Sequence, residues 1–145
     1  PLMGHYSCVS CNVCQYTKHS KELNLGGGHV WYQRKHTNCN SKNVIYLITC
    51  PCGLRYIGMT TRAVKIRIQE HCSNIRRKKS TTRMANHYIE AGHSEKDMSW
   101  IIIEQLNDQK NIEQILYEKE QRWIYKLSTE KGELNDEIIW SSIGL

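Results

Sequence analysis

The sequence contains no phenylalanine and no long apolar run. Its 145 residues include 4 Trp and 8 Tyr, but hydrophobic residues make up only 39% of the chain. This fraction is low for a globular domain, so we expect the core to need additional support. No stretch approaches the ~18 consecutive apolar residues that cross a membrane, and the sequence therefore predicts no membrane contact.

Other familiar signals are also missing. The first residues, Pro1 to Tyr6, show no basic run followed by an apolar run, so this end does not resemble a secretory signal. Residue 1 is not methionine, and we therefore expect the chain to be an excerpt of a longer polypeptide. The sequence contains no internal repeat and no low-complexity tract.

Acidic residues are the minority among the charged residues. The 20 Lys and Arg residues against 14 Asp and Glu give a net charge of +6 and a pI near 9.0. This balance suits a polyanionic partner, of which nucleic acid is the commonest. Charge alone fits a soluble basic protein without such a partner equally well.

The cysteines are numerous and closely spaced. An odd number of cysteines without a signal peptide argues against a secreted disulfide scaffold. Together with seven histidines, close cysteine pairs indicate metal ligands instead. The seven cysteines are Cys8, Cys11, Cys14, Cys39, Cys50, Cys52 and Cys72.

The chain divides into two segments at about residue 42. Residues 1–42 are rich in cysteine, poor in hydrophobic residues and interrupted by a predicted loop at Gly26–Gly28. Because such a segment cannot build its own core, we expect a zinc ion to stabilise it. Residues 43–145 have the regular pattern of a folded domain.

The second segment predicts an α+β fold with a small, mainly antiparallel three-stranded sheet flanked by helices. Val44–Thr49 is a β-branched and aromatic run, and a predicted turn joins it to a returning strand over 54–59. A helix capped by Thr60 or Thr61 is expected next, with Cys72 on its apolar stripe. The remaining predicted elements are a helix over 84–91 ended by Gly92, a strand over 98–103, a helix over 111–127 and a packed tail at 138–140.

Several polar residues fall at positions where they can meet. Arg67 and His71 lie one turn apart on the first predicted helix, and His71 falls inside its apolar stripe. On the last predicted helix, Glu120 sits at the margin of the apolar stripe, whereas Glu118 points away from it. Glu120 is therefore expected to face the site and Glu118 to be solvated.

The ordered motifs around these residues resemble the GIY-YIG nuclease superfamily over roughly residues 43–140. Val44-Ile45-Tyr46 and Tyr56-Ile57-Gly58 correspond to its two strand motifs, with Val44 in place of the first glycine. Met59 stands where a lysine commonly follows the second motif. The resemblance implies an active site that contains Tyr46, Tyr56, Arg67, His71, Glu120 and Asn135.

The chain is more similar still to the endonuclease domain of Penelope-like retroelements, for example in Asn86-His87-Tyr88 and Glu120-Gln121-Arg122-Trp123. This resemblance implies a nuclear enzyme that nicks double-stranded DNA, attached to a reverse transcriptase in the parent polypeptide. It implies Mg²⁺ or Mn²⁺ on Glu120, because one carboxylate can hold a divalent cation that stabilises charge at phosphoryl oxygens. A tyrosine or histidine can move the proton, and arginine can bind phosphate bidentately.

Two zinc sites are expected. The resemblance implies a closed structural site on Cys50, Cys52, His87 and His93. The spacing of the remaining cysteines indicates a second site on Cys8, Cys11, Cys14 and Cys39, in which His5, His19, His29 or His36 could replace one cysteine.

A basic loop after the first helix is expected to contact DNA phosphates. It contains Arg76, Arg77, Lys78, Lys79 and Arg83. Two other functions keep the cysteines and the charge, namely a catalytically silent zinc module that binds nucleic acid and a zinc-finger adaptor that binds protein. The complete set of nuclease residues favours the enzyme.

Overall fold

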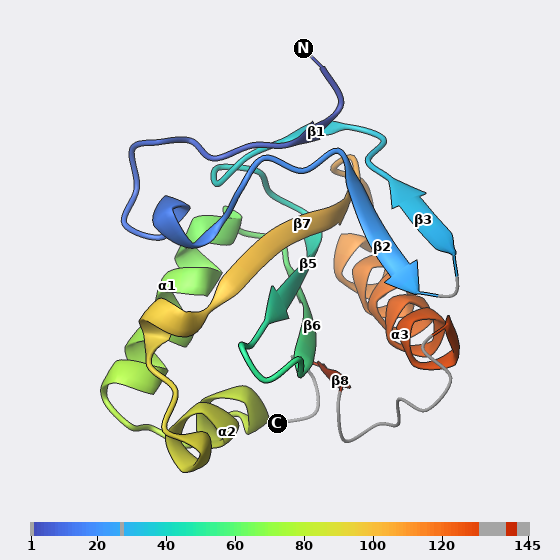
Figure 1. Cartoon of the computed structure of the whole chain (residues 1–145). Coiled ribbons are helices and arrows are strands. Elements are labelled where there is room, and N and C mark those ends of the chain that lie inside the picture. The colour runs from blue at the N-terminus through green and yellow to red at the C-terminus, as the bar shows by residue number, and fades with distance from the viewer. Residues whose placement is uncertain (1, 27, 131–138, 142–145) are drawn as a thin grey trace.

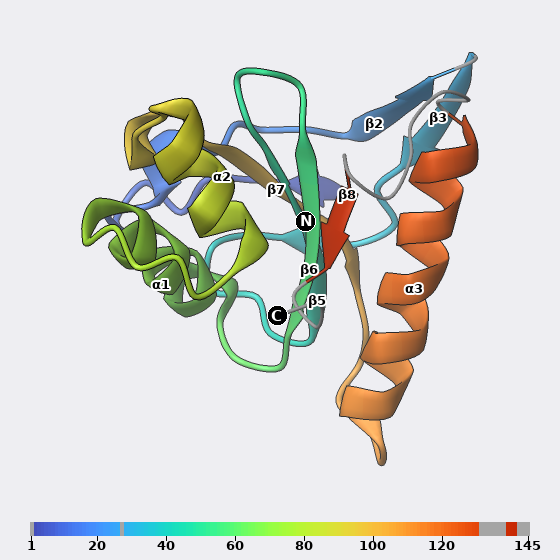
Figure 2. The ribbon, with the colours of Figure 1, turned by 90° about the horizontal axis from the view of Figure 1, so that it is seen from below.

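The computed structural model describes residues 2–26, 28–130 and 139–141. A central sheet lies between helices α1 (Val64–Arg76) and α2 (Arg83–Ala91) on one side and helix α3 (Ile112–Glu130) on the other (Figure 2). The predicted α+β fold is confirmed. No helix in the described ranges combines the length and the apolar composition that a membrane span requires.

The central sheet has four strands in the order β7-β5-β6-β8. Strands β5 (Val44–Thr49), β6 (Arg55–Thr60) and β7 (Ser99–Gln105) are antiparallel, as predicted. Strand β8 (Ile139–Ser141) pairs in parallel with β6 at the edge, where the sequence indicated only a packed tail.

Alternation along β5 divides the core into two parts, since successive side chains of a strand point to opposite faces. Tyr46 and Ile48 pack toward α1 and α2, in the face that we name the α1–α2 face. Ile45 and Leu47 pack toward α3, in the α3 face. The continuous apolar run of β5 thus serves a sheet that is covered on both sides.

The helices begin and end largely as their sequences predict. In α1 the predicted apolar stripe is buried, Cys72 included, but the expected threonine cap is wrong. Ala63 precedes the helix without a side-chain cap, because Thr60 still belongs to β6. Thr82 caps α2 by accepting a hydrogen bond from the Ala85 amide at 3.1 Å, and Gly92 ends it at φ 72°.

The N-terminal segment contains more regular structure than its composition indicates. It forms β1 (Gly4–His5), the 3₁₀ turn η1 (Cys14–Tyr16) and β4 (His36–Thr37), and β1 pairs with β4. Strands β2 (Glu22–Gly26) and β3 (His29–Tyr32) form a hairpin around the glycines, where only a loop was expected. A second 3₁₀ turn, η2 (Glu95–Asp97), precedes β7.

This segment crosses the sheet and packs against both parts of the core (Figure 1). Val13 is 1% exposed, and its carbonyl accepts a hydrogen bond from Trp100 Nε1 at 3.0 Å on the α1–α2 face. Trp31 packs on the α3 face and donates from Nε1 to the Ile103 carbonyl at 2.9 Å. Val13 and Trp31 therefore pack against residues 43–145 rather than in a core of the segment's own, whereas Val9 and Tyr32 are exposed.

Candidate active site and metal centres

Strands β5 and β6 bring Tyr46 and Tyr56 to the same face of the sheet, against His71 of α1. The Tyr46 hydroxyl lies 2.9 Å from His71 Nε2 in a buried hydrogen bond. The Tyr56 and His71 ring centroids are 5.1 Å apart, and those of the two tyrosines are 6.2 Å apart. The three side chains thus form one cluster, as the order of the motifs predicts.

Gly58 makes room for this cluster. It pairs with Tyr46 across the β5–β6 ladder, and the Tyr46 ring lies over it. A Cβ atom at position 58 would lie 2.2 Å from Cζ of Tyr46, well inside van der Waals contact. The glycine is therefore needed for the close approach of the ring and not for an unusual backbone angle.

Burial keeps the Tyr46–His71 pair uncharged. It raises the pKa of the Tyr46 phenol well above 10, and it lowers the pKa of His71 well below 6.5, with a further lowering by the Arg67 charge. Near pH 7 both side chains are neutral, so one proton is shared in a hydrogen bond between a phenol and an imidazole. This pair can pass a proton without burying a charge beforehand.

Arg67 extends the cluster toward solvent. Its Nη1 atom donates to Oε1 of Glu70 at 3.1 Å, and 19% of its side chain is exposed. Arg62 also binds Glu70, through two hydrogen bonds of 2.7 and 3.0 Å. The sequence did not indicate this arrangement, although Glu70 precedes His71 directly and lies three residues from Arg67.

Glu120 is a buried carboxylate on α3. It is 0% exposed, whereas Glu118 is exposed, as the helical pattern predicts. Burial raises the pKa of Tyr46, and the charge of Glu120 adds to this effect. A buried carboxylate is a suitable single protein ligand for a divalent cation. Asn135, the sixth predicted residue, lies outside the described residues.

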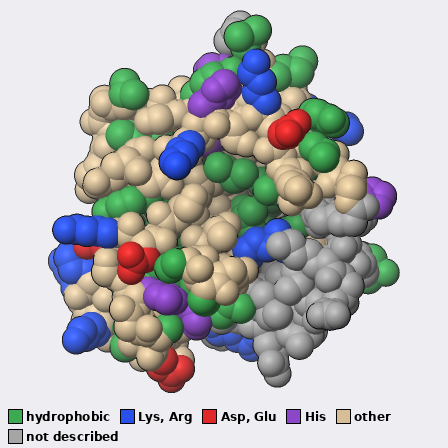
Figure 3. All heavy atoms as spheres, viewed as in Figure 1, with side chains coloured by type: hydrophobic (Ala, Val, Ile, Leu, Met, Phe, Trp, Pro, Cys, Tyr) green, Lys and Arg blue, Asp and Glu red, His purple; other side chains and the backbone are tan. Residues whose placement is uncertain are grey.

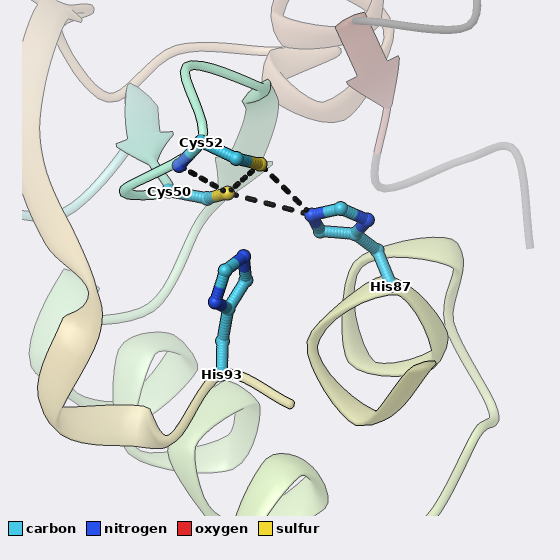
Figure 4. Close-up of side chains that lie close together, drawn as sticks. All are labelled: Cys50, Cys52, His87 and His93. Atoms are coloured by element: carbon cyan, nitrogen blue, oxygen red, sulfur yellow. Dashed lines mark hydrogen bonds between the residues drawn. The ribbon is translucent and has the colours of Figure 1, made fainter. Parts of the chain in front are cut away.

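The four ligands predicted for a zinc site converge between the β5–β6 turn and α2 (Figure 4). Their ligand atoms all lie within 4.8 Å of one another. The His87 Nε2 atom is 3.4 Å from the Cys50 sulfur and 3.2 Å from the Cys52 sulfur. His93 Nε2 is buried and makes no hydrogen bond with any described residue. Two thiols and two imidazoles in this arrangement fit a closed tetrahedral zinc site.

The two thiols of this group differ in acidity. Burial raises the pKa of Cys50 to about 11. Burial also raises the pKa of Cys52, but hydrogen bonds, chiefly from Cys50, outweigh it and lower the value to about 6. The group thus presents a thiolate, which is the form in which cysteine binds zinc.

The N-terminal cysteines form a second group, but only three of the four predicted ligands meet. Cys8, Cys11 and Cys39 have their sulfurs within 4.8 Å of one another. Cys14 is not in this group, because it begins η1 and its thiol donates to the Cys11 carbonyl at 2.8 Å. Three thiols can hold a zinc ion if a fourth ligand completes the site.

The histidines proposed as replacements do not join the N-terminal group. His5 is buried, and its ring nitrogens are 3.1 and 2.9 Å from the hydroxyls of Thr37 and Thr17. His19 and His36 stack on the ring of Tyr6. His29 is exposed on β3.

The predicted basic loop is exposed between α1 and α2. Lys and Arg side chains lie along this edge of the molecule, at the left in Figure 3. Lys78 has φ 55°, so the chain turns sharply after the helix. Arg76 is held by Glu95 through two hydrogen bonds of 2.9 and 3.1 Å. Arg77, Lys78, Lys79 and Arg83 are exposed.

Comparison with known proteins matches residues 42–133 of the chain to a family described as the GIY-YIG catalytic domain. The matched region begins just before β5 and includes the tyrosine cluster, the Cys50–His93 group and α3. It leaves out the N-terminal segment with its three gathered cysteines. Searches of curated proteins and of solved structures found no match.

Proposed function

This chain belongs to the GIY-YIG catalytic domain family, and we propose that it is a divalent-cation-dependent DNA endonuclease that hydrolyses phosphodiester bonds. The observation that carries the proposal is the buried Tyr46–His71 hydrogen bond of 2.9 Å beside Tyr56 and Arg67. If Tyr46 and Tyr56 only packed the core, they would not need a histidine buried beside them. A buried polar pair is costly, and proton transfer gives it a purpose.

In the proposed reaction a water oxygen bonds to phosphorus and the bond from phosphorus to the 3′ oxygen breaks. The water gives its proton to the Tyr46 oxygen while Tyr46 passes its own proton to His71 Nε2. Arg67 exchanges Glu70 for the phosphate oxygens, to which it can donate bidentately. The 3′ oxygen takes a proton from solvent, which leaves a 3′ hydroxyl and a 5′ phosphate.

Glu120 would hold the catalytic Mg²⁺ or Mn²⁺. A divalent cation supplies charge stabilisation at the phosphoryl and leaving oxygens, which none of the neutral groups in the cluster can provide. The group on Cys50, Cys52, His87 and His93 would hold zinc in a structural role, since all four ligands come from the protein.

The biological setting follows from the resemblance to Penelope-like retroelements. We infer that the domain acts in the nucleus, next to a reverse transcriptase in the same parent polypeptide. A nick that leaves a 3′ hydroxyl on double-stranded DNA would provide a primer for that enzyme. The exposed basic loop supports a duplex substrate, because phosphate contacts position a nuclease on DNA without sequence preference.

A catalytically silent module that binds nucleic acid is the alternative. It is supported by the complete burial of Tyr46, His71 and Glu120, because a substrate phosphate must reach catalytic side chains. Arg67, by contrast, is partly exposed. Such a module would bind DNA with or without magnesium. An enzyme would cut only when the cation is present.

A plasmid nicking assay tests the proposal. Supercoiled DNA is incubated with the chain and Mg²⁺ or Mn²⁺, and the nicked form is measured over time. Glu120→Gln should lower the rate roughly 10³-fold or more, because the cation contributes several kcal/mol to charge stabilisation. Glu118→Gln is the matched control, since this exposed glutamate lies two residues away. Equal rates for the parent and a folded Glu120→Gln protein would remove Glu120 from the mechanism.

A further inference from the structure

A cavity of about 480 Å³ opens on the α3 face, lined by residues of β3, β7 and α3 and of the chain that follows β3. It lies on the opposite side of the sheet from the Tyr46–His71 pair. Residues of the N-terminal segment, including Trp31 and Arg34, form one of its walls. The family match begins at residue 42, so this wall lies outside the matched region.

The lining of this cavity, which we name the α3 groove, is strongly basic. Its charged residues are five cations and one carboxylate. Glu104, the carboxylate, is already engaged by Trp123 Nε1 at 2.8 Å and by Lys119 at 3.3 Å. The cations are Arg34, Lys35, Lys119, Arg122 and Lys126. An anion is therefore the occupant that the charge favours.

Two tryptophans form the apolar floor of the groove. The rings of Trp31 and Trp123 meet edge to face, with centroids 4.9 Å apart. Arg34 lies over the Trp31 ring at 4.7 Å from its centroid, and Lys126 lies 5.4 and 5.5 Å from the two rings. Trp123 is 4% exposed and packs beneath the half-buried Trp31, so Trp31 is the ring that can stack on a nucleobase, next to cations for its phosphate.

Hydrogen bonds to β7 hold the groove wall in place. Trp31 Nε1 donates to the Ile103 carbonyl at 2.9 Å, and Gln33 Nε2 donates to the Ile102 carbonyl at 2.8 Å. Gln33 is 6% exposed, so its side chain has been buried for this contact. A wall fixed in this way loses little entropy when a ligand binds.

We propose that the α3 groove binds an unpaired nucleotide of a single nucleic-acid strand. The size of the cavity suits one base with its phosphate, whereas a duplex is too wide to enter it. An acidic peptide would use the cations but not the tryptophan floor. This site goes beyond the proposed hydrolysis and does not require it, because no residue of the groove belongs to the Tyr46–His71 cluster.

Binding of a fluorescent oligothymidylate, measured by anisotropy without added Mg²⁺, tests the proposal. Arg122→Gln with Lys126→Gln should weaken binding at least about 10-fold and lower the salt dependence by about 0.7, since the one phosphate contact that is lost on a single strand contributes roughly that much. The control pair Lys18→Gln with Lys96→Gln removes the same charge from exposed sites elsewhere and should change affinity less than about 2-fold.

Stacking is tested separately. Oligothymidylate should quench tryptophan fluorescence in the parent and quench it less in Trp31→Phe, which keeps an aromatic ring in the groove. A poly-glutamate peptide of the same length should bind at least about 10-fold more weakly than the oligonucleotide, because single-strand binding adds stacking to charge. Equal binding of the peptide, equal losses in both variant pairs, or unchanged quenching in Trp31→Phe would overturn the proposal.

The groove variants also separate this proposal from the proposed nuclease. Arg122→Gln with Lys126→Gln should nick supercoiled duplex at the parent rate, since neither residue belongs to the proposed catalytic cluster. Loss of oligothymidylate binding with intact nicking supports the groove alone. A parent chain that binds oligothymidylate through the groove but never nicks DNA would contradict only the nuclease.

Discussion

The two faces of the central sheet are stabilised in different ways. The α1–α2 face buries polar side chains, Tyr46 and His71 among them, and both cysteine groups pack against it. The α3 face is covered by aliphatic residues and Trp123, without a cysteine among the described members of its core. Polar groups reduce the net gain from burial, so the buried polar side chains of the α1–α2 face offset part of its apolar stabilisation. Metal ligation on that face can compensate for this cost.

The largest effect is expected from removal of zinc, which should destabilise the α1–α2 face and leave the α3 face nearly intact. Structural zinc contributes roughly 10 kcal/mol or more of apparent binding free energy in small domains, comparable with the whole stability of a domain. Chelation, or Cys52→Ser, should increase amide hydrogen exchange strongly in α2 while α3 stays better protected. Cutting should be lost at the same time, because the β5–β6 turn joins the strands of Tyr46 and Tyr56.

Two comparisons make the zinc prediction specific. Cys11→Ser should loosen the N-terminal segment and spare α2, and Cys72→Ser should leave the zinc content unchanged, since Cys72 belongs to neither group. Elemental analysis of the tag-free parent should give two zinc ions per chain. A well-folded chain without zinc, or with its cysteines in disulfides, would contradict the assignment.

The second-largest effect is expected from one methyl group added on the α1–α2 face, which should lower both the stability and the nicking rate. Gly58→Ala places Cβ 2.2 Å from Cζ of Tyr46, and such overpacking costs about 1–3 kcal/mol of unfolding free energy. It also moves Tyr46 from His71, and a displacement of about 1 Å can lower a rate roughly 100-fold. The rate of plasmid nicking and thermal unfolding measure the two effects.

Ile57→Val is the control on the α3 face. Ile57 is the neighbour of Gly58 on β6 and is fully buried toward α3. The smaller side chain should cost about 0.5–1.5 kcal/mol of unfolding free energy and leave the nicking rate at the parent level. If both variants cut at the parent rate, the contact between Gly58 and Tyr46 has no catalytic role.

A comparable loss of rate, with a smaller loss of stability, is expected when only a hydroxyl is removed. Tyr46→Phe keeps the ring over Gly58 but loses the hydrogen bond to His71, and proton transfer by a positioned group contributes roughly 100-fold or more to a rate. Tyr56→Phe should lower the rate as well. Tyr88→Phe is the control, because its buried hydroxyl makes no hydrogen bond with described residues. Parent rates in both active-site variants would make the two tyrosines structural.

The sequence predicted the structure of the α1–α2 face better than the rest of the fold. The β-branched run of β5, the stripe on α1 and the margin position of Glu120 follow from periodicity, which is local. The zinc group at Cys50 came from a resemblance, and the structure places its four predicted ligands together. Periodicity and motif order therefore sufficed for residues that lie on regular elements or in the short turns beside them.

Features that depend on contacts between distant segments were missed. The hairpin β2–β3 forms around glycines that indicated a loop, since Trp31 gains its burial from α3 and β7. Cys14 leaves the N-terminal group because η1 directs its thiol to a carbonyl. The role of Gly58 depends on its pairing with Tyr46 across the two strands, and the amino-acid sequence alone does not show that register.

The smallest effect is expected from the basic loop, and it tests whether the two faces bind different forms of DNA. Arg77, Lys78 and Lys79 are exposed beside the α1–α2 face, so they should contact duplex phosphates. Replacing all three with Gln should flatten the salt dependence of duplex binding by about 0.9 for each phosphate that is no longer neutralised.

The control is a triple variant, Lys18→Gln with Lys96→Gln and Lys110→Gln, which removes the same charge from other exposed positions. Oligothymidylate binding in the α3 groove should not change. An unchanged salt slope for duplex DNA would assign the loop to solubility, because a protein that neutralises fewer phosphates must release fewer counterions on binding.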